Sequence, residues 1–171
     1  PEFRAVSEAR RLNSQNVKAN YLGIEGDVAY GKLAAELLLG AENPRFQIGN
    51  WVAAQSLGGT GGLRVVADFL ARCRVTDTIW HTNPTWVNHQ AIFNAAGLQT
   101  KPFPYLNAAG NGLDFSGMMS ALEQIPTGHA VLLHGCCHNP TGVDPTAEQW
   151  TSIIEVLKQR SLLPILDCAY Q

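Results

Sequence analysis

The fold of this chain is decided by residues 131–142, which read VLLHGCCHNPTG. A continuous apolar run of strand length opens the stretch, and a turn sequence that contains Asn139, Pro140 and Gly142 closes it. Continuous apolar strands are typical of parallel sheets that helices cover on both faces. These features predict a buried strand at residues 129–134 that ends in a polar turn at the edge of a sheet.

Similar apolar runs lie on both sides of this stretch, between segments with helical spacing of apolar residues. The expected strands are 51–56, 78–81, 99–102, 129–134 and 162–166, and the expected helices are 2–16, 27–39, 63–74, 88–96, 115–124 and 147–160. Strands and helices in alternation indicate an α/β fold with three α/β/α layers around a mostly parallel sheet.

Length, composition and charge narrow the class of protein. The 171 residues are 46% hydrophobic and 15% charged, which is typical of a globular domain. The net charge is −2 without a run of Lys or Arg, so nucleic acid and anionic membranes are not expected partners. No apolar run could cross a bilayer, and 4 cysteines are too few for a disulfide scaffold. We expect a cytoplasmic protein, with the mitochondrial matrix as the alternative.

Polar residues follow several of the expected strands, where open α/β sheets bind their ligands. The run GGTGG at residues 58–62 follows the first strand, and its backbone N–H groups could hold a phosphate at a helix start. Trp86, Asn139 and Asp167 follow later strands. An anion-binding run, an aromatic ring, an amide and a carboxylate together predict a site for a planar, phosphorylated ligand that contains nitrogen.

Each of these signals also has an ordinary structural explanation. The glycine run could be a plain strand-to-helix turn, because it lacks the Gly-Lys-Ser/Thr of a P-loop and the third glycine of the dinucleotide motif. Asp167 could cap a helix or form an ion pair, and Trp86 could belong to the core. Each residue taken alone therefore leaves both interpretations open.

A metal site is a further alternative, since His134 and His138 enclose Cys136 and Cys137. The segment enters a turn sequence, which disfavours the helical geometry that brings residues four apart together. A second Cys/His pair that would complete a zinc site is missing from the sequence. The sequence therefore predicts no metal site.

The longer stretch VLLHGCCHNPTGVDPT at residues 131–146 closely resembles the aspartate aminotransferase family, within the fold-type I pyridoxal-phosphate enzymes. Other stretches resemble the family in the same order along nearly the whole chain, namely residues 20–24, 55–64, 83–89, 112–115 and 167–171. The resemblance implies that residues 1–171 are a fragment of the cofactor-binding large domain. Residues 1–20 would approach it from the N-terminal or small-domain side, and the catalytic-lysine half and the C-terminal small domain would be absent.

The resemblance also implies roles for individual residues. Those implied to bind pyridoxal 5'-phosphate are Tyr21, Gly58, Gly59, Thr60, Trp86, Asn139, Asp167 and Tyr170. Three of these are implied to be catalytic: Trp86 stacks on the pyridine ring, Asp167 pairs with the ring nitrogen, and Tyr170 contacts the phenolic oxygen together with Asn139. The residues implied to support Asp167 are His89 and His134. A further implication is a homodimer, because Tyr21 would reach the phosphate of the neighbouring subunit.

The implied reaction is reversible amino-group transfer between L-aspartate and 2-oxoglutarate, which gives oxaloacetate and L-glutamate. An aromatic or broad-specificity aminotransferase of the same branch is the alternative, and a non-catalytic anion-binding fragment is the alternative from another class. In the family, the lysine that forms a Schiff base follows the position of Tyr170 within Ser-x-x-Lys. The lysines of this chain lack that context; they are Lys18, Lys32, Lys101 and Lys158. We therefore expect the chain alone to be inactive, and its abrupt start and end suggest that it is cut at both ends.

Overall fold

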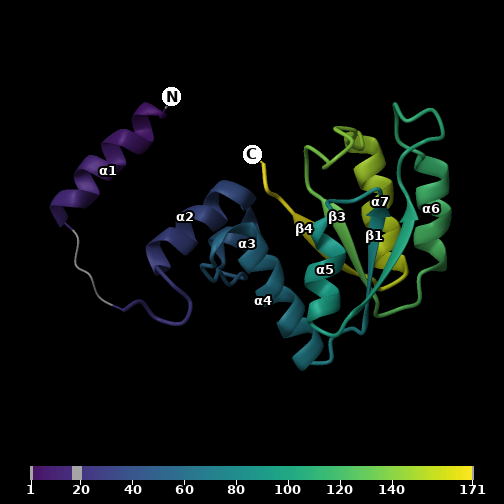
Figure 1. Ribbon diagram of the computed structural model, residues 1–171, viewed down its shortest axis with the longest axis horizontal. Helices are drawn as coiled ribbons and strands as arrows, with labels where there is room; N and C mark the ends of the chain where they lie inside the picture. The colour runs from purple at the N-terminus through teal and green to yellow at the C-terminus, as the bar shows by residue number, and fades with distance from the viewer. Residues whose placement is uncertain (1, 17–20, 171) are drawn as a thin grey trace. The chain divides into compact units, whose positions relative to one another are not determined.

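The computed structural model describes residues 2–16 and 21–170 of the chain (Figure 1). Two compact units make up the chain, residues 1–55 and residues 56–171. Every buried hydrophobic residue of the described ranges lies between Leu63 and Leu162, so the hydrophobic core belongs to the second unit. Within the described residues, no helix combines the length and the apolar content needed to cross a membrane.

The first unit consists of helices with little burial. Its helices are α1 (Arg4–Asn16), α2 (Val28–Leu39) and α3 (Pro44–Gln47). Asp27 caps α2 by accepting a hydrogen bond from the backbone N–H of Tyr30 at 3.0 Å, and Gly40 ends the helix with φ 86°. No residue of α2 is buried, so its apolar side chains lie at the surface of this unit.

The expected strand at residues 51–56 is wrong, because the structure has no strand there. Residue Gln55 donates one backbone hydrogen bond to the carbonyl of Glu25 at 2.8 Å, and the side chain of Val52 is 98% exposed. An apolar run becomes a strand only where a neighbouring strand pairs with its backbone groups and a layer covers its side chains. This segment pairs with no strand, and its residues 52–56 are exposed.

The described part of the second unit forms a parallel sheet with the strand order β2-β1-β3-β4. The strands are β1 (Thr78–Asn83), β2 (Gln99–Pro104), β3 (Ala130–His134) and β4 (Leu163–Asp167). The helices are α4 (Gly58–Arg72), α5 (Asn88–Ala95), α6 (Phe115–Gln124) and α7 (Ala147–Gln159). These strands and helices confirm the remaining predicted elements, with shifts at their ends.

The three-layer arrangement is confirmed by how β3 divides its side chains. Ala130 and Leu132 pack in a core cluster with residues of α4 and α5, whereas Val131 and Leu133 pack with residues of α6 and α7. Figure 1 shows these two helix pairs on opposite sides of the sheet. All five residues of β3 are buried, and each fully buried Leu or Val contributes about 1.5–3 kcal/mol. The strand therefore holds its carboxyl end firmly in place.

Candidate active site

The carboxyl ends of β3 and β4 lie side by side, and this places two chemically active side chains next to each other. His134 ends β3 and pairs in register with Asp167, which ends β4. On the other side of β3, β1 ends at Asn83, and the chain then runs through Trp86 into α5, which carries His89 near its start. Parallel pairing thus gathers residues that are far apart in the sequence at one edge of the sheet.

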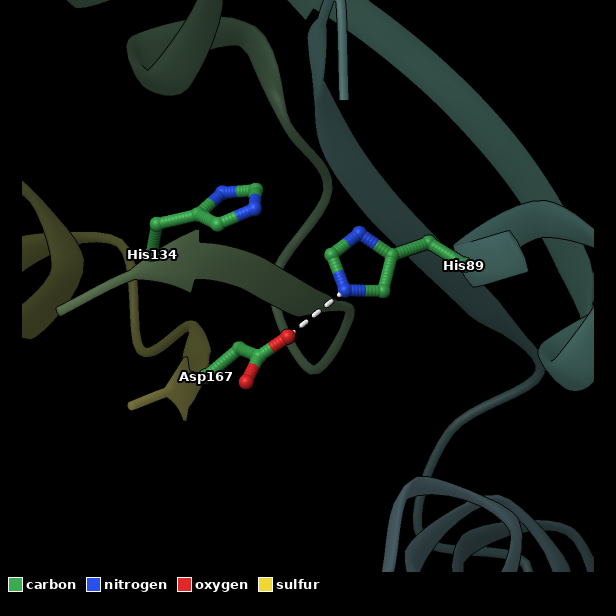
Figure 2. Close-up of side chains that lie close together, drawn as sticks. All are labelled: His89, His134 and Asp167. Atoms are coloured by element: carbon green, nitrogen blue, oxygen red, sulfur yellow. Dashed lines mark hydrogen bonds and ion pairs between the residues drawn. The ribbon is translucent and has the colours of Figure 1, made fainter. Parts of the chain in front are cut away.

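Asp167 and His89 form the central pair of this edge (Figure 2). The Nε2 atom of His89 donates to Oδ2 of Asp167 at 2.8 Å, because a carboxylate can only accept. On the other side of the ring, Nδ1 shares a hydrogen bond of 2.7 Å with the hydroxyl of Thr85. The side chain of His89 is 0% exposed and that of Asp167 is 17% exposed. The ring is therefore fixed from both sides and holds one carboxylate oxygen in place.

The carboxylate of Asp167 remains ionised at neutral pH. The hydrogen bond from His89 holds the pKa of Asp167 below its ordinary value, although burial acts in the opposite direction. Figure 2 shows Oδ2 directed at His89 and the other oxygen turned away from it. Among the described residues, none donates a hydrogen bond to Oδ1. One oxygen of a charged, mostly buried carboxylate is thus available to a cationic N–H group, which fits the protonated nitrogen of a pyridine ring.

His134 differs from His89 in that its ring has no hydrogen-bond partner among the described residues. Its ring is 8% exposed and lies 5.2 Å from the ring of His89 and 4.3 Å from that of His138. Both ring nitrogens are buried, and neither has a hydrogen-bond partner in the part of the chain that the structure describes. Burial, followed by the nearby His89, lowers the pKa of His134, so the ring is neutral at pH 7. A buried polar ring without a partner marks a place where a water or a ligand group completes the site.

Trp86 lies at the border of this cluster. Its ring meets the ring of His89 edge to face, with centroids 5.3 Å apart and planes at 86°. Trp86 also packs against the core cluster that contains residues of α4 and α5, but it remains partly exposed. The indole is thus held beside the Asp167–His89 pair without being enclosed by the core.

The glycine run lies at the start of α4, because this helix begins at Gly58 and not at Leu63 as the sequence predicted. The N-cap residue Leu57 offers no side-chain acceptor to the first turn. Gly58 and Gly59 are exposed, and a Cβ atom on either would meet no atom within 4 Å. The N–H of Gly58 bonds to the carbonyl of Ser56 at 3.0 Å. The following N–H groups of the first turn and the positive end of the helix dipole, in open space, fit a phosphate group.

The remaining predicted residues are placed less closely. Asn139 is partly buried in the turn after β3, and Tyr170 is exposed after the end of β4. The two segments touch where the thiol of Cys136 donates to the carbonyl of Tyr170 at 3.1 Å. Tyr21 belongs to the first unit and is fully exposed, and Asn20 of the same motif lies outside the described residues.

The chain is similar to known proteins along almost its whole length. The model of the family described as "Aminotransferase class I and II" matches residues 3–171. The chain belongs to this family. Its relatives include the aromatic-amino-acid aminotransferase of Escherichia coli (strain K12), 45% identical over 173 residues, and the aspartate aminotransferase of the same bacterium, 41% identical over 172 residues. Both alignments cover 100% of this chain and only 44% and 43% of the relatives, so the chain spans less than half of their length.

Solved structures of aminotransferases have the same fold. An aromatic-amino-acid aminotransferase from Burkholderia pseudomallei, covalently bound to pyridoxal phosphate, superposes with a TM-score of 0.96 at 43% identity. The aspartate aminotransferase from the cytoplasm of Saccharomyces cerevisiae superposes with a TM-score of 0.93 at 35% identity. These matches cover 100% and 98% of this chain, and 43% and 41% of those structures. The fold is that of the fold-type I pyridoxal-phosphate aminotransferases.

The metal alternative involves a different set of residues from the one the sequence suggested. The described residues that bring donor atoms within 4.8 Å of one another are His89, His134 and Asp167, without a cysteine. His138 uses both ring nitrogens on the hydroxyls of Thr82 and Thr141. Because His89 and Asp167 already bond to each other, an ion would have to break the shortest contact of the set. The geometry of this aminotransferase chain suits a nitrogen cation better.

Sequence reasoning missed the residues that surround the site. Thr85 lies four residues before His89, so the spacing at the start of a helix could have indicated the contact. The structure also ties Tyr105 and Asp144 to the turn after β3. Asp144 lies within the stretch 131–146 that carries the family resemblance, but the sequence does not show what its carboxylate contacts, and nothing in the sequence distinguishes Tyr105 from other aromatic residues.

Proposed function

We propose that the chain is part of the cofactor-binding large domain of a pyridoxal-phosphate-dependent aminotransferase, with residues 1–20 approaching from the N-terminal or small-domain side. The observation that carries the proposal is the Asp167 carboxylate, which is ionised, oriented by His89 and, among the described residues, without a donor at its other oxygen. Pyridoxal 5'-phosphate, when bound, supplies a conjugated ring that accepts electrons from the amino-acid substrate. The ring is a better acceptor when its nitrogen is protonated, and an adjacent carboxylate favours that protonated form.

Each residue of the site has a defined part in this proposal. Asp167 holds the proton on the ring nitrogen, and His89 keeps the carboxylate ionised and oriented. Trp86 offers its indole to the ring face. The other groups that would hold the cofactor are the first turn of α4 with Gly58, Gly59 and Thr60 for the phosphate, and Asn139 and Tyr170 for the phenolic oxygen. His134 would complete its hydrogen bonds with water or with groups of the site.

The proposed reaction of the whole protein is reversible amino-group transfer between L-aspartate and 2-oxoglutarate. An aromatic or broad-specificity aminotransferase is the second candidate, and it is supported by the slightly higher identity to an aromatic relative, 45% against 41%. We place the activity in the cytoplasm, with the mitochondrial matrix as the alternative; a relative named as cytoplasmic, from Oryza sativa subsp. japonica, is 43% identical over 165 residues. A homodimer in which Tyr21 serves the partner's phosphate is part of the same proposal.

The test compares the whole protein with this chain. The whole protein, supplied with pyridoxal phosphate, should transaminate 2-oxoglutarate with aspartate, and the same assay with phenylalanine or tyrosine decides between the two candidates. Residues 1–171 alone should show no turnover, and borohydride should link no cofactor to any of the four lysines, Lys18, Lys32, Lys101 and Lys158. Absence of transamination with every amino acid would overturn the proposal, and a reducible linkage to one of these lysines would overturn the assignment of the lysine to another part of the protein.

A further inference from the structure

The turn after β3 contains a carboxylate that the proposed chemistry does not use. Asp144 accepts two backbone hydrogen bonds, from the N–H of Cys137 to Oδ2 at 2.7 Å and from the N–H of His138 to Oδ1 at 2.8 Å. Cys137 has φ 51°, in the left-handed region, and two consecutive amides in such a bend form a concave binding site for an anion. Both oxygens of Asp144 therefore clamp the two residues that directly precede Asn139.

The side chain of His138 fastens the same turn to the sheet. Its ring is 2% exposed, and Nε2 lies 3.0 Å from the hydroxyl of Thr82 on β1. Its Nδ1 lies 2.8 Å from the hydroxyl of Thr141, on the far side of Asn139. The ring stacks on Tyr105 with centroids 3.9 Å apart and planes at 15°. The residues on both sides of Asn139 are thus tied to one buried ring.

The buried ring keeps one protonation state over a wide pH range. Burial, followed by the nearby His134, lowers the pKa of His138 to about 4. A neutral imidazole has one donor and one acceptor, and these match the hydroxyls of Thr82 and Thr141, which can each act in either role. The contacts of His138 are therefore constant at the pH values where an aminotransferase would work.

Asn139 itself has no such support. Over the described ranges 2–16 and 21–170, its side-chain amide makes no hydrogen bond, and the residue is partly buried. The position of this amide is thus set by the backbone of the turn. We propose that Asp144 and His138 are positioning residues, which hold the turn so that the Asn139 amide faces the cofactor ring. The inference rests on the proposed function, which assigns Asn139 to the phenolic oxygen.

The decisive experiment is a double-mutant cycle on the dissociation constant of pyridoxal phosphate, measured with the whole protein. We expect Asn139→Ala to weaken binding by about tenfold, since it removes a hydrogen bond to a charged oxygen. Asp144→Asn keeps the size of the side chain but offers an N–H where an acceptor is needed, and should weaken binding roughly three- to tenfold. In the Asn139→Ala background, Asp144→Asn should have no further effect.

The matched control is Glu155→Gln, which removes a negative charge from an exposed position of α7. It should leave the affinity unchanged in both backgrounds. Equal weakening by Asp144→Asn with and without Asn139 would show that Asp144 acts on the fold in general, and would overturn the proposal. If Asp144→Asn does not fold, Thr141→Val replaces it in the cycle, because this change removes the hydroxyl that His138 contacts.

A second measurement needs no cofactor and separates this inference from the proposed function. In Asp144→Asn, the backbone amides of Cys137 and His138 should exchange with solvent about tenfold faster, and the side-chain amide resonances of Asn139 should shift. Unchanged exchange and unchanged resonances would overturn the positioning role. Failure of the wild-type protein to bind pyridoxal phosphate would instead count against the proposed function, while the exchange result still decides whether Asp144 and His138 hold the turn.

Discussion

His89 and His134 reach the same edge of the sheet, yet their hydrogen bonds differ completely. Both nitrogens of His89 have partners, Thr85 on one side and Asp167 on the other. Both nitrogens of His134 are buried without one among the described residues. A histidine with two fixed partners can orient a neighbour, whereas one without partners still has hydrogen bonds to offer. This edge of the sheet therefore combines a histidine that already holds Asp167 in place, His89, with a histidine whose ring nitrogens can still bind a ligand or water, His134.

The buried neutral histidines should make the fold sensitive to acid, and this is the largest effect we expect. The pKa values of His81, His134 and His138 are all lowered, mainly by burial, and that of His138 falls to about 4. Between the ordinary pKa of about 6.5 and these lower values, the unfolded chain binds protons that the folded chain does not. Stability should thus be complete above pH 6.5 and fall as the pH decreases.

For His138 alone, the interval from about 6.5 to about 4 corresponds to about 3 kcal/mol of folding free energy. Urea denaturation at a series of pH values from 7.5 to 4.5 measures the loss. His138→Gln should be less stable than the wild type at pH 7.5 but should show a flatter pH dependence. A wild-type stability that stays constant over this range would contradict the neutral burial of these rings.

Removing the carboxylate that His89 holds should have the next largest effect. In the whole protein, Asp167→Ala leaves the ring nitrogen without its charge partner, so we expect loss of at least two powers of ten in α-proton exchange, about 2.7 kcal/mol. Asp167→Glu should retain more activity than Asp167→Ala, because it keeps the charge. Single-turnover exchange with cofactor-saturated variants is the measurement. Near-normal exchange in Asp167→Ala would mean that this carboxylate is only structural.

The two histidines themselves give the most direct comparison. His89→Ala removes a ring that is fully enclosed and leaves the Asp167 carboxylate mostly buried without a donor. The loss of a hydrogen bond to a charged group and the creation of a cavity should lower the free energy of unfolding by about 2–3 kcal/mol. Thr85→Val, which removes only the hydroxyl on the other nitrogen, should lower it by about 1 kcal/mol. Equal stability of His89→Ala and the wild type would show that the pair supports function but not the fold.

The sequence alone could predict the sheet where local pattern and burial agree. The apolar run before Gly135 predicted β3 because all five of its residues are buried, and the same pattern failed at residues 51–56, where residues 52–56 are exposed. The start of α4 was missed because glycines have low helix propensity, although a first helical turn needs no preceding hydrogen bonds. Periodicity cannot detect either difference, since the strand depends on neighbours distant in the sequence and the helix start lies in a run of glycines without apolar spacing.

The site was predictable in its residue types but not in its contacts. The resemblance singled out Asp167, His89 and His134, and the structure brings these three together at the ends of two strands and the start of a helix. The resemblance could not indicate that both ring nitrogens of His89 would have hydrogen-bond partners, while those of His134 would have none among the described residues. The clamp by Asp144 was also invisible, because a carboxylate that accepts two backbone N–H groups leaves no pattern in the sequence.

The smallest effect is expected at His134, and it tests the comparison from its other side. His134→Phe replaces an unpartnered buried imidazole with an apolar ring that is slightly larger, so it removes two unsatisfied nitrogens at the risk of slight crowding. These terms oppose each other, and the cofactor-free chain should change in stability by less than about 1 kcal/mol. His134→Asn, which keeps a donor and an acceptor in a smaller side chain, is the matched variant. Urea denaturation of both, without cofactor, gives the comparison with His89→Ala. If His134→Phe destabilised the cofactor-free chain as much as His89→Ala does, then His134 would have hydrogen-bond partners of its own, in the form of bound water. The distinction between a histidine with two partners and a histidine with none would then be wrong.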